Sequence, residues 1–436
     1  MWWKEKNGFW RNGSEKARRT EKALSMGFLA ILLLTPVMMA DLPHCFGPIR
    51  GKADSPWMRE EKPDRAGEED PYAGPGDDMT GRTYADAETE YIAAICHAAG
   101  GKAGEADPSD DPEMLRPMIL ALGERGYAAV DQKNQINMTE PEQVCRFVRA
   151  AETGEDAVLT VIVVAGPDTF TRYRFCAENG KETADALYCR YDGAGRICDR
   201  HAAGYASVSW RYTSEGYFLF EGSGFSDMDY LLTLSAVTEH IALRVEPLEE
   251  ICREYNRRYI LPVGYGRNNL FLTDWSEEDF GEVNFQDLFD IFYGILYGHP
   301  VPWTAGRNAG AGVVWQIPEE IFYEVLSGYF CMDRETLRSR MAYSPASGTC
   351  EYRPRGFSDT EYPDIPYPEV IDCEENKDKT ITLLVQAVYP HDNTSRAFLH
   401  RVVIRPLADG SFQYVSNHML SGENPPDLWW HSDRSS

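Results

Sequence analysis

Four carboxylates lie close together near the middle of the chain, in the stretch TDWSEEDFGE: Asp274, Glu277, Glu278 and Asp279. Two paired carboxylates can act as general acid and base on a glycosidic bond, and a cluster can bind Ca²⁺. Asp274 and Glu278 are therefore the candidate catalytic residues. The structural alternative is a turn capped by Thr273 or Asp274, with acids placed favourably at a helix start.

Two cysteines flank a turn signal centred on Asp192 and Gly195. Cys189 and Cys198 lie equally far from that turn, on opposite sides of it. If the segment is a hairpin, we expect the two side chains to face each other near disulfide range. The alternative is that both are buried free thiols that pack as small hydrophobic groups.

Aromatic and basic residues near the C-terminus are candidates for binding. Trp429 and Trp430 lie in a terminal segment, where an exposed ring could stack on a sugar or pack on a partner. Core packing is the alternative for both rings. Arg353 and Arg355 lie in a Pro- and Tyr-rich connection that could form an extended recognition edge or a stiff connector.

Motifs for most catalytic and cofactor chemistry are missing from the sequence. It contains no CxxC, HExxH, GxSxG, Walker A or GxGxxG pattern, and no Ser-x-x-Lys. We therefore predict no metal and no cofactor. The same absence favours a non-enzymatic protein over an enzyme.

The net charge of −26 excludes a general nucleic-acid binder, because phosphate contacts need a basic surface. The charge is uneven, however: residues 1–22 carry seven Lys or Arg and three Glu, and residues 23–40 carry no charge. As a helix, that uncharged stretch would be about 27 Å long, close to a hydrocarbon core of about 30 Å. We expect a cytoplasmic tail at 1–22 and a transmembrane or signal segment at 23–40, with the rest extracytoplasmic.

Residues 41–84 are rich in Pro, Gly and acids, with scattered apolar residues. Such a segment cannot bury enough apolar surface to offset its chain entropy, so we predict a disordered acidic linker. The predicted topology is a single-pass cell-membrane protein, and the alternative is secretion after cleavage at Ala40.

Residues 85–436 show the pattern of an α+β protein in which helices pack on antiparallel sheets. Two units are expected, an α+β domain with an antiparallel meander at 85–228 and a second α+β domain with C-terminal strands at 229–436. A T-E-P-E sequence predicts a helix capped by Thr139, and Pro117 is expected to bend or shorten the helix before it. The expected helices and strands, read from apolar periodicity and turn signals, are 86–99, 112–123, 139–151, 247–259, 284–297, 319–329 and 334–340 for helices, and 127–131, 157–165, 169–177, 184–191, 197–205, 207–213, 217–221, 230–235, 241–245, 380–389, 396–405 and 412–418 for strands.

Several long strings resemble one known family. They are LPVGYGRNNLFLTDWSEEDFGEVNFQDLFDIFYG, YRPRGFSDTEYPDIPYPEV, PLADGSFQYVSNHM and WWHSD. The sequence is similar to an uncharacterised domain family of exported or membrane-anchored proteins in Gram-positive anaerobes, over roughly residues 113–433. The resemblance implies export and a shared fold, but no activity and no catalytic residue.

The sequence thus predicts an extracytoplasmic binding module of the cell envelope, of unknown activity. Its expected partners are the membrane, through residues 23–40, and an envelope protein or glycan. The alternative is a hydrolase of envelope glycans or peptides that uses a carboxylate pair.

Overall fold

The first sheet is a five-stranded meander with one parallel strand at its edge. Its order is β1-β2-β3-β4-β5, and only the β1–β2 pair is parallel. Helices and strands of this region are α2 (Met79–Ala99), α3 (Pro112–Glu124), β1 (Ala128–Asp131), α4 (Pro141–Thr153), β2 (Ala157–Gly166), β3 (Thr169–Glu178), β4 (Lys181–Tyr191) and β5 (Ile197–Tyr205). This computed structural model describes residues 79–100, 112–205, 207–224, 237–304, 313–356, 362, 364–420, 428–432 and 434.

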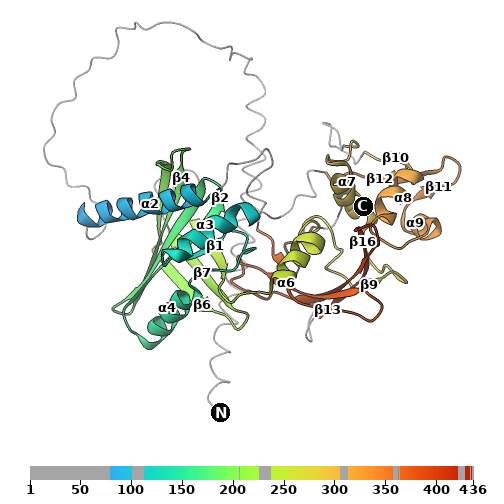
Figure 1. Cartoon of the computed structure of the whole chain (residues 1–436). Coiled ribbons are helices and arrows are strands. Elements are labelled where there is room, and N and C mark those ends of the chain that lie inside the picture. The colour runs from blue at the N-terminus through green and yellow to red at the C-terminus, as the bar shows by residue number, and fades with distance from the viewer. Residues whose placement is uncertain are drawn as a thin grey trace, which may run out of the picture. The chain divides into compact units, whose positions relative to one another are not determined.

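Other elements pack on both faces of the first sheet, and β2 accordingly has apolar residues on both of its sides. Ile162 and Val164 pack with α2 and α3 on one face. Val161 and Val163 point to the other face, where α4 and a second sheet lie. The alternation of a strand explains the split, and Figure 1 shows α2 and α3 running across the sheet.

The second sheet, of order β6-β7-β8, is an antiparallel layer that uses both of its faces. Phe218, Phe220 and Leu243 face the first sheet. Tyr217 and Leu219 face the opposite way, toward Val388. Its strands are β6 (Ser207–Tyr212), β7 (Tyr217–Gly224) and β8 (Val237–Arg244).

The C-terminal region holds a five-stranded sheet of order β13-β14-β15-β16-β9 and a three-stranded sheet of order β10-β12-β11. An aromatic core lies between them, and Phe289, Phe292 and Phe330 are completely buried in it. Its elements are α6 (Glu250–Tyr255), the π-helical turn η2 (Asn256–Ile260), β9 (Trp275–Ser276), α7 (Phe285–Tyr297), β10 (Trp315–Pro318), α8 (Glu319–Ser327), α9 (Arg334–Arg340), β11 (Tyr343–Ser344), β12 (Thr349–Tyr352), β13 (Tyr367–Glu375), β14 (Ile381–Val388), β15 (Leu399–Pro406) and β16 (Phe412–Met419).

A buried polar network joins the second sheet to the C-terminal sheet. Glu369 on β13 accepts hydrogen bonds from Tyr217 Oη (2.8 Å), Arg244 Nη1 (3.0 Å) and Gln386 Nε2 (2.9 Å). Asn134, which follows β1, donates to Ala242 O and to Tyr367 Oη. Hydrogen bonds therefore connect three sheets, and those of Glu369 are buried.

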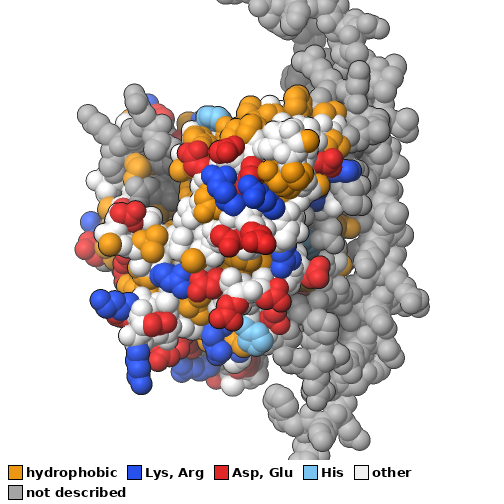
Figure 2. All heavy atoms as spheres, turned by 90° about the vertical axis from the view of Figure 1, so that its right-hand side faces the viewer, with side chains coloured by type: hydrophobic (Ala, Val, Ile, Leu, Met, Phe, Trp, Pro, Cys, Tyr) orange, Lys and Arg blue, Asp and Glu red, His pale blue; other side chains and the backbone are white. Residues whose placement is uncertain are grey.

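The surface over α7–α9 and β10–β12 carries charged side chains and hydrophobic side chains in different places. Figure 2 shows acidic and basic side chains interspersed over this face, with hydrophobic side chains gathered at its upper margin. Large apolar side chains that are exposed here belong to the end of α7 and to β10, namely Ile295, Leu296, Tyr297, Val314 and Trp315. We call these five residues the apolar edge.

The predicted α+β class with antiparallel sheets is confirmed, and most predicted elements are present. The Thr139 cap is wrong: the residue before α4 is Glu140, with φ 49°, and Thr139 Oγ1 instead donates to Tyr127 O. Pro117 does not shorten α3, which continues to Glu124. Residues 79–84, predicted as linker, belong to α2.

Three further differences concern the predicted elements and the predicted domain boundary. The helix predicted at 247–259 splits into α6 and the π-turn η2. Strand β13 lies in and beyond the predicted connector and was not expected. β8 follows the predicted domain boundary at 228–229, yet it pairs with β7 of the preceding part.

The predicted tail (1–22), the membrane or signal segment (23–40), most of the linker and the strand predicted at 230–235 lie outside the described residues. Among the helices that are described, none is both long enough and apolar enough to cross a membrane.

Candidate functional site

A cavity of about 630 Å³ opens between the first sheet and β8. This volume lies within the range of small-molecule sites, roughly 300–1,000 Å³. Val163, Ile241 and Leu243 supply apolar walls, and Thr171, Tyr173, Tyr188 and Glu239 supply polar groups. Tyr367 and Pro390, from the C-terminal region, also line it.

One carboxylate in this cavity, that of Glu239, accepts hydrogen bonds from two tyrosine hydroxyl groups. Tyr173 Oη donates to Glu239 Oε1 at 2.8 Å, and Tyr188 Oη lies 2.7 Å from both Oε1 and Oε2. Tyr173 is buried, while Tyr188 and Glu239 are half-buried. The carboxylate is therefore fixed in direction and still reaches the cavity.

Strand register brings these three residues together. Tyr173 is opposite Ala186 and Tyr188 is opposite Thr171, so the two tyrosines are diagonal neighbours on one face of the β3–β4 pair. Glu239 alternates with Ile241 and Leu243 on the face of β8 that packs on the first sheet. Each residue thus reaches the cavity from a different strand.

Burial raises the pKa of Tyr173 and of Tyr188, and the neighbouring Glu239 adds to both shifts. Both phenols therefore keep their protons at neutral pH and act as donors to the carboxylate. The arrangement presents a fixed hydrogen-bond acceptor with negative charge, suited to the hydroxyl or amine groups of a ligand.

Charged and aromatic side chains of β4 and β5 also line the cavity. Arg190 and Asp199 form an ion pair of 3.5 Å between β4 and β5. His201 lies beside Tyr188, with ring centroids 6.2 Å apart. These side chains, together with Arg200, line the cavity and offer donors, acceptors and ring faces.

An aromatic ledge continues from the cavity. We define the ledge as Tyr362, His391 and Trp429. The His391 ring lies 5.1 Å from that of His240, which lines the cavity, and 6.0 Å from Trp429. Trp429 in turn meets the exposed Tyr362 edge-on at 5.0 Å.

Three of the four acids of the TDWSEEDFGE stretch have separate partners. Asp274 pairs with His418 Nδ1 at 3.2 Å and accepts from Met419 N. Glu277 makes two hydrogen bonds to Arg405. Asp279 pairs with Arg340 at 3.2 Å, and Glu278 is exposed.

Neither Asp274 nor Glu278 lines the cavity. Ser276 Oγ accepts from the backbone of Glu278 and of Asp279, so this stretch folds as a turn.

Cys189 and Cys198 are not cross-strand partners. The predicted hairpin is present, but Cys189 is opposite Arg200, and Cys198 falls at a register shift beside Arg190. Cys189 is buried, Cys198 is exposed, and both are free thiols. The pair nearest the turn, Tyr191 and Ile197, already places Cys198 level with Arg190, and the register shift moves Cys189 one residue further, to face Arg200. The equal spacing therefore did not produce facing side chains.

Trp430 is only 2% exposed and packs in the aromatic core, so its ring offers no open face to a ligand. Arg355 is held by Asp287 of α7 through two hydrogen bonds of 2.9 Å. Arg434 also binds Asp287, at 2.7 Å. Arg355 is therefore part of a buried charge cluster that fixes the C-terminal segment on α7, whereas Arg353 is exposed.

Glu239, Tyr173 and Tyr188 were not predicted as site residues. The sequence pattern of β3 and β4 could have indicated the two tyrosines, because each of them occupies an inward position among small or apolar residues. Glu239 itself could not be paired with them, because β8 lies far along the chain. In the described part of the chain, no group of three or more His, Cys, Asp or Glu is arranged to hold a metal ion.

Comparison with known proteins supports the resemblance seen in the sequence. Residues 82–434 match a family described as a family of unknown function (DUF6070). No curated protein and no solved structure matches the chain. Because the match spans most of the chain, including every residue around the Glu239 cavity, the chain belongs to this family of unknown function, DUF6070.

Proposed function

We propose that this protein is an extracytoplasmic binding module of the cell envelope, and that the cavity around Glu239 binds a hydroxyl-rich ligand such as the sugar units of an envelope glycan. The observation that carries the proposal is the carboxylate held by two phenols inside an open cavity. A carboxylate and tyrosines can hydrogen-bond several hydroxyl groups at once.

The ledge supports a ligand longer than one sugar. Ring faces pack against the apolar faces of sugars, and Trp429 is connected to the cavity through His391 and His240. A bound glycan would place one unit on Glu239 and a following unit against Trp429. This is the binding role predicted for Trp429, joined to a cavity that was not predicted.

Placement outside the cytoplasm rests on the sequence, in which a basic tail precedes an uncharged stretch at 23–40. Fractionation of native cells, with mass spectrometry of the mature N-terminus, tests it. Residues 1–40 retained in the membrane fraction would indicate a single-pass anchor, and a chain that begins near Asp41 in the medium would indicate secretion. Intact protein in the cytosol would contradict the placement.

Binding is tested by titrating purified full-length protein with soluble glycan fragments of the cell wall, followed by calorimetry. Glu239→Gln should weaken binding roughly tenfold to a hundredfold, because a hydrogen bond to a charged group contributes about 1.5–3 kcal/mol. Trp429→Ala should weaken it by a smaller factor. The matched control is Glu178→Gln, an exposed carboxylate at the far end of β3 that does not line the cavity.

Equal affinity of Glu239→Gln and the wild type for every fragment would refute the cavity as the glycan site. The hydrolase alternative is tested in the same samples by measuring turnover. A hydrolase that uses Asp274 and Glu278 would lose activity in the double variant Asp274→Asn/Glu278→Gln. The separate partners of Asp274, Glu277 and Asp279 do not favour that alternative.

A protein partner is the second candidate, favoured by the apolar edge at the end of α7 and on β10. Pulldown from solubilised membranes with the wild type and with Leu296→Glu tests it. A partner that the wild type recovers and the variant does not would support it. Equal recovery by both would contradict a role for the apolar edge.

A further inference from the structure

Two cysteines far apart in the sequence meet between α6 and β13. Cys252 lies in α6 and is buried in the aromatic core, and Cys373 lies in β13 and is half-buried. Cys252 belongs to the hydrophobic cluster of the C-terminal region, and Cys373 packs against the same cluster. Each thiol also contributes to the pKa shift of the other, so the two thiols lie close together.

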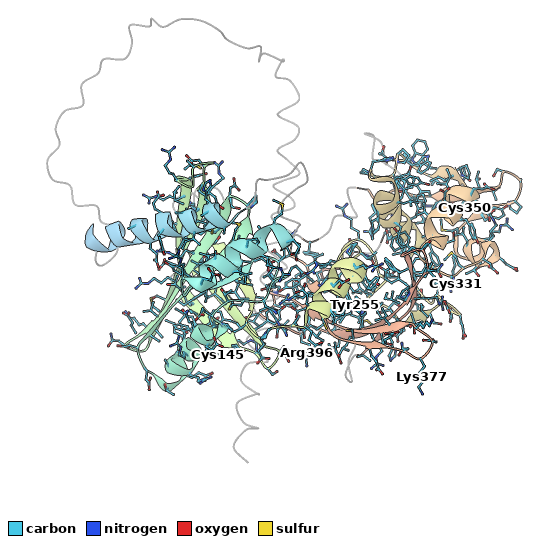
Figure 3. The ribbon with its side chains drawn as sticks, in the orientation of Figure 1. Cys145, Tyr255, Cys331, Cys350, Lys377 and Arg396 are labelled. Atoms are coloured by element: carbon cyan, nitrogen blue, oxygen red, sulfur yellow. The ribbon has the colours of Figure 1, made fainter. Side chains whose placement is uncertain are left out.

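The two elements are held together independently of the thiols. Asn256, directly after α6, donates from Nδ2 to Pro368 O at 3.3 Å and accepts from Val370 N at 3.3 Å. Figure 3 shows Tyr255, the last residue of α6, above the strands of the C-terminal sheet. The backbone positions on both sides of the thiol pair are therefore fixed, which is what a cross-link without rearrangement requires.

We propose that Cys252 and Cys373 form a structural disulfide when the folded protein meets a disulfide oxidant. This proposal does not depend on the glycan-binding function. Cys373, the more accessible thiol, attacks the oxidant as its thiolate and releases one thiol. Cys252 then attacks the sulfur of Cys373 in the mixed disulfide and releases the second thiol.

The step balances: two thiols of the protein become one disulfide, and one disulfide of the oxidant becomes two thiols. The two electrons and two protons that the protein loses are those that the oxidant gains. Small disulfides such as oxidised glutathione, or a protein thiol oxidase, belong to the required class of oxidant. Such oxidants predominate outside the cytoplasm.

The surroundings favour a stable bond over a rapidly switching one. Burial raises the pKa of Cys252 to about 12 and also raises the pKa of Cys373. A thiolate that is disfavoured in the folded protein makes the disulfide harder to reduce, since labile disulfides are those whose reduced form is stabilised. The expected bond therefore forms slowly and then persists.

The test uses purified full-length protein, kept in reductant or incubated with oxidised glutathione at pH 8.5, then alkylated and mapped by mass spectrometry without reduction. We expect a peptide that links Cys252 to Cys373, lighter by two hydrogens than the sum of its parts. Closing a loop on the order of 100 residues should raise Tm by about 5–10 °C relative to the reduced protein.

Cys373→Ser and Cys252→Ser should each abolish both the linked peptide and the Tm increase. The matched control, Cys189→Ser, should retain both. Because Cys373 is half-buried, Cys373→Ser keeps the test valid even if the Cys252 variant folds poorly. Complete alkylation of Cys252 and Cys373 after oxidation, or a Tm increase that persists in Cys373→Ser, would overturn the proposal.

Discussion

The acidic loop at 274–279 and the acids of strands β8 and β13 differ in what surrounds each carboxylate. In the loop, Asp274, Glu277 and Asp279 each pair with a different residue, namely His418, Arg405 and Arg340. On the strands, Glu239 and Glu369 each collect hydrogen bonds from several other elements. A dense run of acids therefore marks solvated surface in this protein, whereas single acids among apolar strand residues mark the sites where charge is buried.

The physical reason is the cost of desolvation. A carboxylate that leaves water must gain hydrogen bonds or an opposite charge. Adjacent acids in one loop repel each other and cannot supply that compensation. A lone acid on a strand can obtain it from neighbouring sheets, which is what Tyr217, Arg244 and Gln386 provide for Glu369.

Of the carboxylates in these two groups, Glu369 should contribute most to the free energy of unfolding. Glu369→Ala removes the partner of the buried Arg244 and leaves that cation uncompensated between two sheets. We expect the free energy of unfolding to fall by about 3–5 kcal/mol. Urea denaturation followed by circular dichroism measures it.

Glu369→Gln is the control, because it keeps the shape and one acceptor oxygen. Tyr217 and Arg244 donate to different oxygens of Glu369, so only one of these two hydrogen bonds can remain. Its loss should be smaller than that of the alanine variant. A loss below about 1 kcal/mol for Glu369→Ala would mean that the network contributes no more than a surface ion pair.

The second prediction concerns the stability of the protein at acid pH, which we expect the buried imidazole of His400 to control. His400 is fully buried, with Nε2 2.9 Å from Tyr265 Oη and Nδ1 2.7 Å from Asn417 Oδ1. Asn417 also donates to Thr273 O, at the start of the acidic loop. Since the Asn417 oxygen can only accept, Nδ1 carries the proton and Nε2 accepts from Tyr265.

Burial lowers the pKa of His400 from 6.5 to about 4. Between these values the unfolded chain binds the proton and the folded chain does not. The contribution of His400 to stability is therefore complete above about pH 6.5 and is lost as the pH falls toward about 4, by about 3 kcal/mol in total.

Urea denaturation at pH 7 and pH 4 measures this loss, and His400→Gln serves as the comparison. The variant should lose about 3 kcal/mol less between the two pH values than the wild type does. Equal losses in the two proteins would show that surface carboxylates, rather than His400, govern acid sensitivity.

A substitution in the acidic loop should have the smallest effect on the free energy of unfolding. Asp274 and His418 are both more than half exposed, so their pairing is weakened by water and salt. Asp274→Asn should change the free energy of unfolding by less than about 1 kcal/mol. Repeating the denaturation at 1 M salt should reduce the difference further, and a loss of several kcal/mol would refute the surface description of the loop.

Local patterns predicted most elements correctly. The predicted strand at 197–205 matches β5, and the predicted helix at 334–340 matches α9, with Asp333 accepting from Thr336 N as its cap. Strand β13 was missed because its sequence, YPEVIDCEE, contains Pro and four acids, which are disfavoured in strands. Its place at the edge of the sheet is what tolerates Pro368 there.

The candidate site was predicted less well than the fold. Trp429 lies on the ledge next to the cavity, but Trp430 belongs to the core, and Arg355 to an internal charge cluster. Cys189 and Cys198 were proposed from their symmetry about a turn, but the strand register does not place them opposite each other. Cys252 and Cys373, which lie close together, are on elements with no visible relation in the sequence.

The residues in their order were enough to predict the α+β class, membership of an uncharacterised family and the positions of most helices and strands, because apolar periodicity, caps and turns act over a few neighbouring residues. The contacts of Glu239 with Tyr173 and Tyr188, the pair of Glu369 and Arg244, and the closeness of Cys252 and Cys373 became visible only in the folded chain. These contacts depend on strand register and on how the sheets pack. Both are set by the burial of whole apolar faces, and no local spacing along the chain records them.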